Sequence, residues 1–272
     1  MAKVSIYIRT YKRDIAWLDF CLQSIHRNLK GWDEIVVGVP EGQEEHLRFL
    51  ESERKVSCPR FRNDYVGQQV AKLQAHRHVR GDYILFVDSD VIFLPGADVR
   101  EFLEDGQPII GRWRYSSMIA AGAHGVKWRP AVARLFGETP EWEYMQGNGA
   151  RLYRTDTLRA FANHFPELET YAHGVLKRMF SEFNFLGFFA EKYEAHRYHF
   201  RDVELEALPP QLSRQFLTVD GLTPATLAEL TTLGFRPRWP STLSLLDKAK
   251  RWLSQTTRHM KQWLNSRSRT PS

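Results

Sequence analysis

Two aspartates separated by one residue, Asp88 and Asp90, are the side chains of this sequence best placed to do chemistry. They follow an apolar run, Tyr83–Val87, that has the length and composition of a buried strand. In an open α/β sheet, ligands bind just beyond the carboxyl ends of the strands. Carboxylate oxygens at that place suit a hard divalent cation, which a bound diphosphate can share. The pattern predicts a cation site, although an acidic turn after a core strand would have the same sequence.

The residues before this pair alternate between strand-like and helix-like segments. Asp14 stands where it could cap the first helix. Strands are predicted at Val4–Ile8, Glu34–Val39, Lys55–Ser57 and Tyr83–Val87, and helices at Ile15–Arg27, Glu44–Ser52 and Gln68–Val79. This alternation is typical of an α/β fold with a mostly parallel, doubly wound sheet. No Gly-x-Gly-x-x-Gly or Gly-Lys-Ser/Thr loop occurs, which argues against dinucleotide dehydrogenases and P-loop nucleotidases.

After Asp90 the pattern is looser. A helix that Thr223 caps should begin at Pro224 and end at Gly234, before a proline-containing linker. Further strands are predicted at Pro108–Gly111 and from Gly147 to Tyr153, and helices at Lys127–Phe136, Asp156–His164 and Glu167–Tyr193, the last with a break near Gly174 or Gly187. We therefore expect a catalytic domain over 1–204, a linker and short helical extension over 205–242, and a basic amphipathic helix and tail over 243–272.

The composition is that of a cytoplasmic enzyme. A chain of 272 residues with 43% hydrophobic content can bury a sizeable core. Cys21 and Cys58 show no disulfide or metal spacing, which favours a reducing compartment. Met1–Lys3 leads directly into a strand-like segment, so no signal peptide is expected, and no apolar run approaches the roughly 20 residues of a membrane span.

Four local patterns, in this order, resemble the GT-A class of nucleotide-sugar glycosyltransferases, and more closely an uncharacterised bacterial glycosyltransferase-like family. They are Ser5–Tyr11, the first strand and a threonine-containing turn; Gly67–Leu73, similar to a Gln-Gln-x-x-Lys-Leu helix; the Asp-x-Asp of Asp88–Asp90; and Ser181–Asn184, similar to Ser-Glu-Tyr/Phe-Asn. The resemblance covers roughly Val4 to Phe200. It implies a GT-A fold, with a mixed doubly wound sheet and a helical C-terminal extension, and metal-dependent transfer of a sugar from a nucleotide-diphosphate donor.

The resemblance also suggests which residues bind the donor. Thr10 and Tyr11, in the turn after the first strand, would hold the nucleotide base. Gln68, Gln69 and Lys72 lie within one helical turn of each other and can face the same strand end. The ammonium of Lys72 would neutralise a phosphate there, whereas the alternative is an ordinary surface lysine.

The expected cofactor is Mn²⁺ or Mg²⁺, with a UDP-sugar as donor, because charge that accumulates on the leaving diphosphate needs a cation. Asp90 should contact the metal directly, and Asp88 the metal or the ribose. The candidate third ligand is His199, or else His196, since imidazole suits manganese better than magnesium. Gly147 and Asn148 stand in a glycine-rich turn that would let the backbone approach the donor sugar, or that simply precedes a strand.

The acceptor hydroxyl must lose a proton as it attacks, so an inverting enzyme needs a general base. Glu182 is the candidate that the Ser-Glu-Phe-Asn resemblance supplies. Its rival is Glu191, for which an ion pair is the simpler explanation. A retaining enzyme would not need this base, and the sequence leaves the stereochemistry open.

The segment 243–272 suggests which kind of acceptor the enzyme binds. The chain has 38 basic and 32 acidic residues. This segment holds seven of the basic residues and a single acidic one, so the rest of the chain has equal numbers of both. One face of the predicted helix carries Leu246, Ala249, Leu253, Thr256, Met260 and Trp263. Such a helix is typical of an anionic membrane interface, with packing on its own domain or contact with DNA as alternatives.

We therefore expect a peripheral enzyme at the inner face of the membrane, acting on a cell-envelope glycan or a lipid-linked saccharide. The alternatives are a phage-type enzyme that glycosylates DNA bases and a non-catalytic protein that binds nucleotide-sugars.

Overall fold

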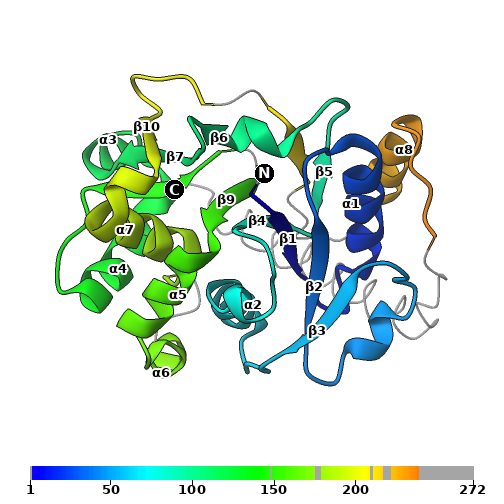
Figure 1. Cartoon of the computed structure of the whole chain (residues 1–272), viewed down its shortest axis with the longest axis horizontal. Helices are drawn as coiled ribbons and strands as arrows, with labels where there is room; N and C mark the ends of the chain where they lie inside the picture. Colours follow the sequence, from blue (N-terminus) through cyan, green and yellow to red (C-terminus); the bar gives the residue numbers. More distant parts are fainter. Residues whose placement is uncertain (1, 148, 175–178, 209–210, 217–221, 239–272) are drawn as a thin grey trace, which may run out of the picture. The chain divides into compact units, whose positions relative to one another are not determined.

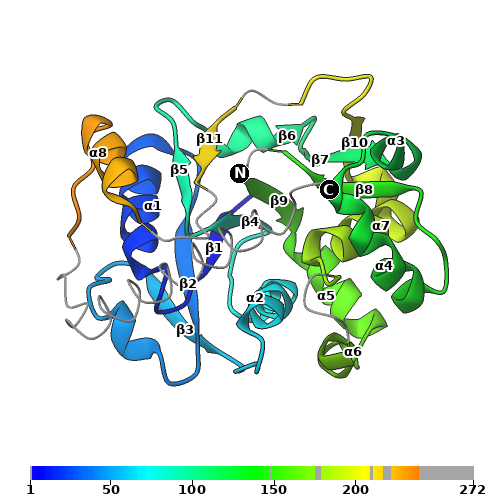
Figure 2. The ribbon, with the colours of Figure 1, turned by 180° about the vertical axis from the view of Figure 1, so that it is seen from behind.

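The computed structural model describes residues 2–147, 149–174, 179–208, 211–216 and 222–238. Residues up to Pro237 form one compact unit. At its centre lies a five-stranded sheet of order β3-β2-β1-β4-β9 (Figures 1 and 2). Its strands are β1 (Val4–Arg9), β2 (Glu34–Pro40), β3 (Arg54–Cys58), β4 (Tyr83–Asp88) and β9 (Ala150–Arg154). The first four are parallel, whereas β9 runs antiparallel to β4, which confirms the predicted mixed α/β sheet.

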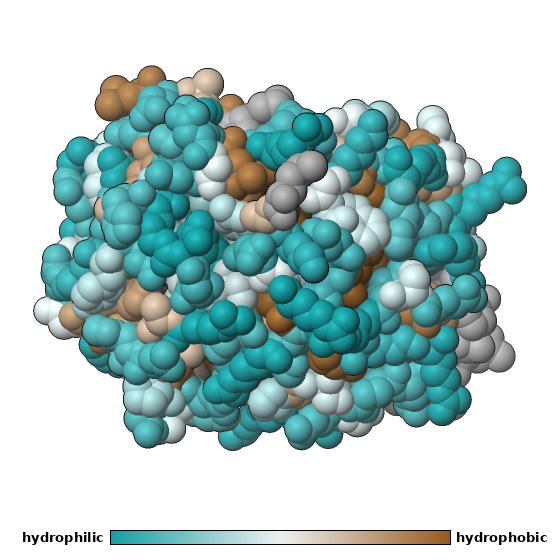
Figure 3. Space-filling view, in the orientation of Figure 1, coloured by the Kyte–Doolittle hydropathy of each residue, from teal (hydrophilic) through white to brown (hydrophobic). Residues whose placement is uncertain are grey.

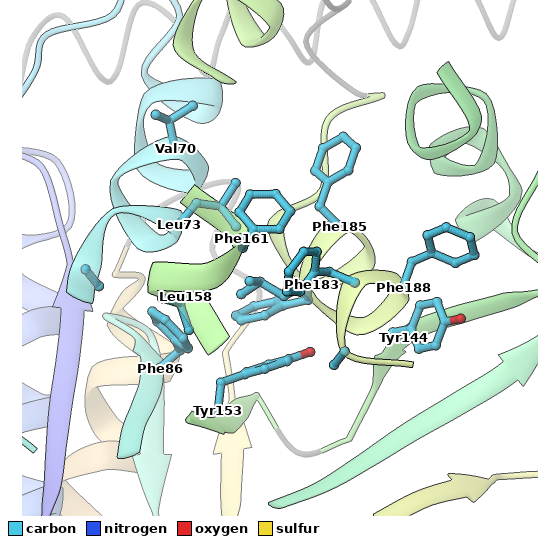
Figure 4. Close-up of a cluster of buried hydrophobic side chains, with 14 of the residues drawn as sticks. Val70, Leu73, Phe86, Tyr144, Tyr153, Leu158, Phe161, Phe183, Phe185 and Phe188 are labelled. Atoms are coloured by element: carbon cyan, nitrogen blue, oxygen red, sulfur yellow. The ribbon is translucent and has the colours of Figure 1, made fainter. Parts of the chain in front are cut away.

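Helices cover both faces of this sheet. Successive side chains of a strand point to opposite faces, so β1 sends Ile6 and Ile8 to one hydrophobic cluster and Tyr7 to another. The first cluster includes the apolar side of α1 (Ile15–Asn28). The second is built with α2 (Asp64–Leu73), α5 (Thr155–His164), α6 (Leu168–Gly174) and α7 (Glu182–Glu194). Figure 4 shows part of this second cluster, in which aromatic rings from several elements meet.

A second, smaller sheet is organised around β7 (Gln107–Arg114). It pairs in parallel with β10 (His199–Asp202) and antiparallel with β6 (Leu103–Glu104) and β8 (Trp142–Gln146). The helices α3 (Tyr115–Ala120) and α4 (Arg129–Phe136) lie between β7 and β8 in the chain.

The C-terminal part of the described chain returns to the start of the fold. The strand β11 (Ser213–Gln215) pairs antiparallel with β5 (Val91–Phe93), which follows the two aspartates. The helix α8 (Pro224–Thr232) begins as predicted, with the Thr223 hydroxyl accepting from the Thr226 N–H. The described residues between 205 and 237 thus contribute β11 and α8. The predicted helix over 243–272 lies outside the described residues.

Several helix boundaries differ from the predictions. The helix expected at Glu44–Ser52 is a short 3-10 turn, Glu44–Leu47, and the one expected at Gln68–Val79 begins earlier and ends at Leu73. The long helix predicted over 167–193 is two helices, α6, which ends at Gly174, and α7, which begins at Glu182. The Ser181 hydroxyl caps α7 by accepting from the Asn184 N–H. Gly187 interrupts nothing and lies inside α7.

The surface carries few large hydrophobic side chains. The exposed ones in the described part of the chain are Tyr65, Ile119, Tyr193, Leu205 and Leu233, which belong to separate segments. The face shown in Figure 3 is mainly hydrophilic. Within the described ranges, no helix is both long and apolar enough to cross a membrane.

The contact between α7 and β8 predicts the effect of one substitution. A Cβ atom added at Gly187 would lie 2.3 Å from both Cβ and Cγ of the buried Tyr144, near the start of a side chain that cannot swing away. We expect Gly187→Ala to lower the free energy of unfolding by about 1–3 kcal/mol, through overpacking. Gly174→Ala is the matched control, because an added Cβ there meets nothing within 4 Å. Equal melting temperatures of the two variants by calorimetry would contradict this close packing.

Candidate active site

A buried lysine joins three of the motifs that the sequence singles out. Lys72 of α2 donates to Asp88 at the end of β4, with Nζ 2.6 Å from Oδ1, and to Glu182 at the start of α7, with Nζ 2.8 Å from Oε1. Lys72 is 3% exposed and Glu182 4%. An ammonium buried to this degree needs compensating carboxylates. The alternative of an ordinary surface lysine is therefore wrong.

The ammonium and the carboxylates of this cluster stabilise one another's ionised forms. Burial alone would lower the pKa of Lys72, but the carboxylates of Asp88 and Glu182 outweigh it and raise this pKa. Burial works to raise the pKa of Asp88, yet the ammonium of Lys72 keeps it below its usual range. Lys72 and Asp88 are both ionised at neutral pH.

Phe183 anchors Glu182 in the hydrophobic core. Its ring stacks on Tyr153 of β9, with ring centroids 6.2 Å apart (Figure 4). Two cations lie against the same ring, with Lys72 Nζ 5.0 Å and the Arg151 guanidinium carbon 4.7 Å from its centroid. The aromatic core thus fixes where α7 begins, and with it the position of the Glu182 carboxylate beside Lys72.

The second aspartate meets the first through Gln215 of β11. Gln215 Nε2 donates to Asp88 Oδ2 and to Asp90 Oδ1, each 3.2 Å away. The Phe216 N–H donates to the carbonyl oxygen of Asp90 at 2.9 Å. Burial, followed by the charge of Asp88, raises the pKa of Asp90 to about 6. Oxygens of two aspartates therefore converge on one point, which a single amide nitrogen occupies.

Two further carboxylates lie near this pair. Asp14 precedes α1, but its side chain makes no capping hydrogen bond, so the predicted capping role is wrong. Burial, then the charges of Asp90, Asp64 and Asp88, raises the pKa of Asp14 to about 7. Asp64, in the first turn of α2, is paired at 2.7 Å with the buried Arg9. Burial and the neighbouring carboxylates therefore both oppose the ionisation of Asp14.

This donor set fits a divalent cation. Proteins often hold Mg²⁺ with one or two carboxylates and leave the remaining positions to substrate phosphates and water. Asp88 and Asp90 supply two such oxygens, and the repulsion among the carboxylates would be relieved by a positive charge. The described residues contain no group of three or more His, Cys, Asp and Glu side chains placed to hold a metal. His199 lies on β10, with Nδ1 3.9 Å from Glu104 Oε2 rather than against either aspartate.

The predicted nucleotide-binding residues lie just after β1 and on α2. Thr10 is buried at the end of β1, where its N–H donates to the Gly38 carbonyl oxygen at 2.9 Å. The Thr10 hydroxyl and the Gln69 side-chain oxygen are buried without a hydrogen-bond partner in the described structure. Tyr11 and Gln68 are half-buried. Unpaired buried polar atoms call for an explanation, and a bound ligand is one.

The remaining predicted residues lie in two places. Gly147 is exposed with a φ of +135°, a conformation that favours glycine, and Asn148 lies outside the described residues. Glu191, the rival base, is bonded to Arg112 and to the Tyr144 hydroxyl, in agreement with the simpler explanation.

The sequence interpretation missed Gln215 and Asp64. Gln215 stands in a short segment without any motif, so nothing in the sequence pointed to it. Asp64 lies one helical turn before Gln68, and it would have been found by extending the predicted helix toward its N-terminus.

Comparisons with known proteins agree with this geometry. The family model described as Glycosyl transferase family 2 matches residues 5–161, more than half of the chain. No curated protein sequence matches it. A solved structure of the galactosyltransferase LgtC, in complex with donor and acceptor sugar analogs, is similar with a TM-score of 0.55 and 12% identity, over 87% of this chain and 98% of that one.

At this identity the structural likeness shows the GT-A fold alone. The family match spans β1, α2 and the two aspartates, and it carries the activity. The chain belongs to glycosyl transferase family 2, and it is a nucleotide-sugar glycosyltransferase.

Proposed function

We propose that the transfer is metal-dependent, and that Asp88 and Asp90 hold Mn²⁺ or Mg²⁺ against the diphosphate of a UDP-sugar. The observation that carries this proposal is the convergence of Asp88 Oδ2 and Asp90 Oδ1 on one point, 3.2 Å from each, at the end of β4. A cation bound there would neutralise the charge that develops on the leaving diphosphate.

Lys72 and Glu182 prepare this site. We assign Lys72 to Asp88 instead of to a donor phosphate, the role expected from the sequence. Its ammonium bonds to Oδ1 of Asp88, which leaves Oδ2 for the point that Asp90 also faces. Glu182 is the second carboxylate bonded to the Lys72 ammonium, and its side chain is 6% exposed. We place Glu182 as a positioning residue, because a role as general base would require release of its contact with Lys72.

The donor would extend from this cation toward β1 and the glycine-rich turn. The unpaired Thr10 hydroxyl and Gln69 oxygen supply hydrogen-bonding capacity for the nucleoside, beside Tyr11 and Gln68. Gly147 would border the donor sugar, because backbone without a side chain permits a close approach. The same role, expected for Asn148, concerns a residue outside the described ones.

The acceptor we propose is a cell-envelope glycan or a lipid-linked saccharide. Its support is the concentration of the basic excess in 243–272, on a segment with an apolar stripe and tryptophans. Sugar transfer to DNA bases is the alternative that the same basic residues allow.

Removal of Asp90 tests the metal site. The full-length protein should release UDP from a UDP-sugar in the presence of Mn²⁺, and Asp90→Ala should reduce that rate by about 10²–10³-fold, the usual cost of an electrostatic stabiliser. Asp156→Ala is the control, since that carboxylate is 48% exposed and pairs with Arg154 and Arg197 instead. Unchanged turnover in Asp90→Ala would show that the metal assignment is wrong.

Glu182→Gln separates positioning from base catalysis. The amide can still accept from Lys72, but the lost charge should loosen Asp88, so we expect the Kd for UDP with Mn²⁺ to rise about tenfold and the melting temperature to fall. Glu191→Gln should leave UDP binding unchanged, because Glu191 contacts Arg112 and Tyr144. A large loss of kcat with unaltered UDP affinity would instead identify Glu182 as the general base.

Co-sedimentation tests the acceptor proposal. The full-length protein should bind phosphatidylglycerol-containing vesicles but not neutral ones, and replacement of Trp252 and Trp263 by serine should abolish this binding. Salt-sensitive binding to duplex DNA, without vesicle binding, would favour DNA as the acceptor.

A further inference from the structure

Gln215 reaches the two aspartates from a distant part of the chain. It lies 127 residues from Asp88 and 125 from Asp90 in sequence, yet its amide nitrogen is 3.2 Å from a carboxylate oxygen of each. It also lies beyond residues 5–161, which the family model matches. The family match therefore assigns this residue no role.

The position of Gln215 is fixed from several sides. Its backbone pairs with Val91 in the β5–β11 ladder. The next residue, Phe216, donates its N–H to the Asp90 carbonyl oxygen, and its ring packs on Trp17 with centroids 5.4 Å apart. On the remaining side Gly149 has a φ of +76°, and a Cβ there would lie 3.2 Å from Gln215 Cβ. The strand, the ring and the glycine direct this amide at the aspartates.

A side-chain amide can interact favourably with this site both without and with a bound cation. Its N–H partially offsets the two carboxylates when no cation lies between them. A cation bound beside all three groups would repel the N–H, but rotation about the last side-chain bond puts the amide oxygen in the place of the nitrogen, where it can face the cation. Side-chain carbonyl oxygens are ordinary ligands of hard divalent cations.

We propose that Gln215 is the third protein ligand of the catalytic cation, with its amide N–H bridging Asp88 and Asp90 in the metal-free protein and its carbonyl oxygen binding the metal. This inference rests on the metal-dependent function proposed above. It gives β11 a task in the reaction, because the two aspartates alone supply only two of the ligands.

Mn²⁺ binding to the full-length protein tests the inference, measured from the electron paramagnetic resonance of free Mn²⁺ with and without UDP. Gln215→Leu, which keeps the bulk but has no oxygen, should weaken Mn²⁺ binding about tenfold or more. Gln215→Glu should bind Mn²⁺ at least as tightly as the unmodified protein. Glu229→Gln is the control, since the Glu229 side chain is 39% exposed and pairs with Arg214 at the surface.

Thermal unfolding separates this role from a structural one. Gln215→Glu adds a carboxylate to a crowded acidic site, so its melting temperature should fall in chelator and recover when Mn²⁺ is added. Equal losses with and without Mn²⁺ would indicate packing alone and would overturn the inference.

The Mn²⁺-binding results also separate the role of Gln215 from the metal-dependent function on which it rests. Mn²⁺ binding that Asp90→Ala abolishes and Gln215→Leu leaves intact would overturn the role of Gln215 alone. Absence of Mn²⁺ binding to the unmodified protein would overturn both.

Discussion

The site depends on one buried positive charge, the ammonium of Lys72. It is hydrogen-bonded to Asp88 at 2.6 Å and to Glu182 at 2.8 Å, and so ties α2 to the end of β4 and the start of α7. Leaving the ammonium of Lys72 or the carboxylate of Glu182 buried without a partner would cost several kcal/mol. The ion pairs therefore hold α2, the end of β4 and the start of α7 together.

This arrangement divides the charges unequally. Asp88 shares the lysine, whereas Asp90 and Asp14 lie nearby with raised pKa values, to about 6 and about 7, because burial and neighbouring carboxylates oppose their ionisation. A protein that only needed a stable core would not gather carboxylates in this way. The surplus of negative charge at the carboxyl end of β4 is what a donor diphosphate and its cation would neutralise together.

Local patterns predicted much of the fold and named several residues of the candidate site. The apolar run before Asp88 and the strand–helix alternation predicted the parallel sheet, because hydrophobic periodicity and turn residues are visible within a few neighbouring positions of the sequence. They did not reveal that Lys72 bridges Asp88 and Glu182, nor that Gln215 bridges the aspartates, since these contacts join residues far apart in sequence. Asp14 was misjudged because a residue before a helix has the same local pattern whether it caps the helix or faces a charged site.

The most direct measurement is the anomalous scattering of Mn²⁺ in crystals of the protein grown with UDP. We predict one peak about 2–2.5 Å from both Asp88 Oδ2 and Asp90 Oδ1, with Lys72 still hydrogen-bonded to the other oxygen of Asp88. A peak elsewhere, or a Lys72 that leaves Asp88 to bind the diphosphate, would contradict it.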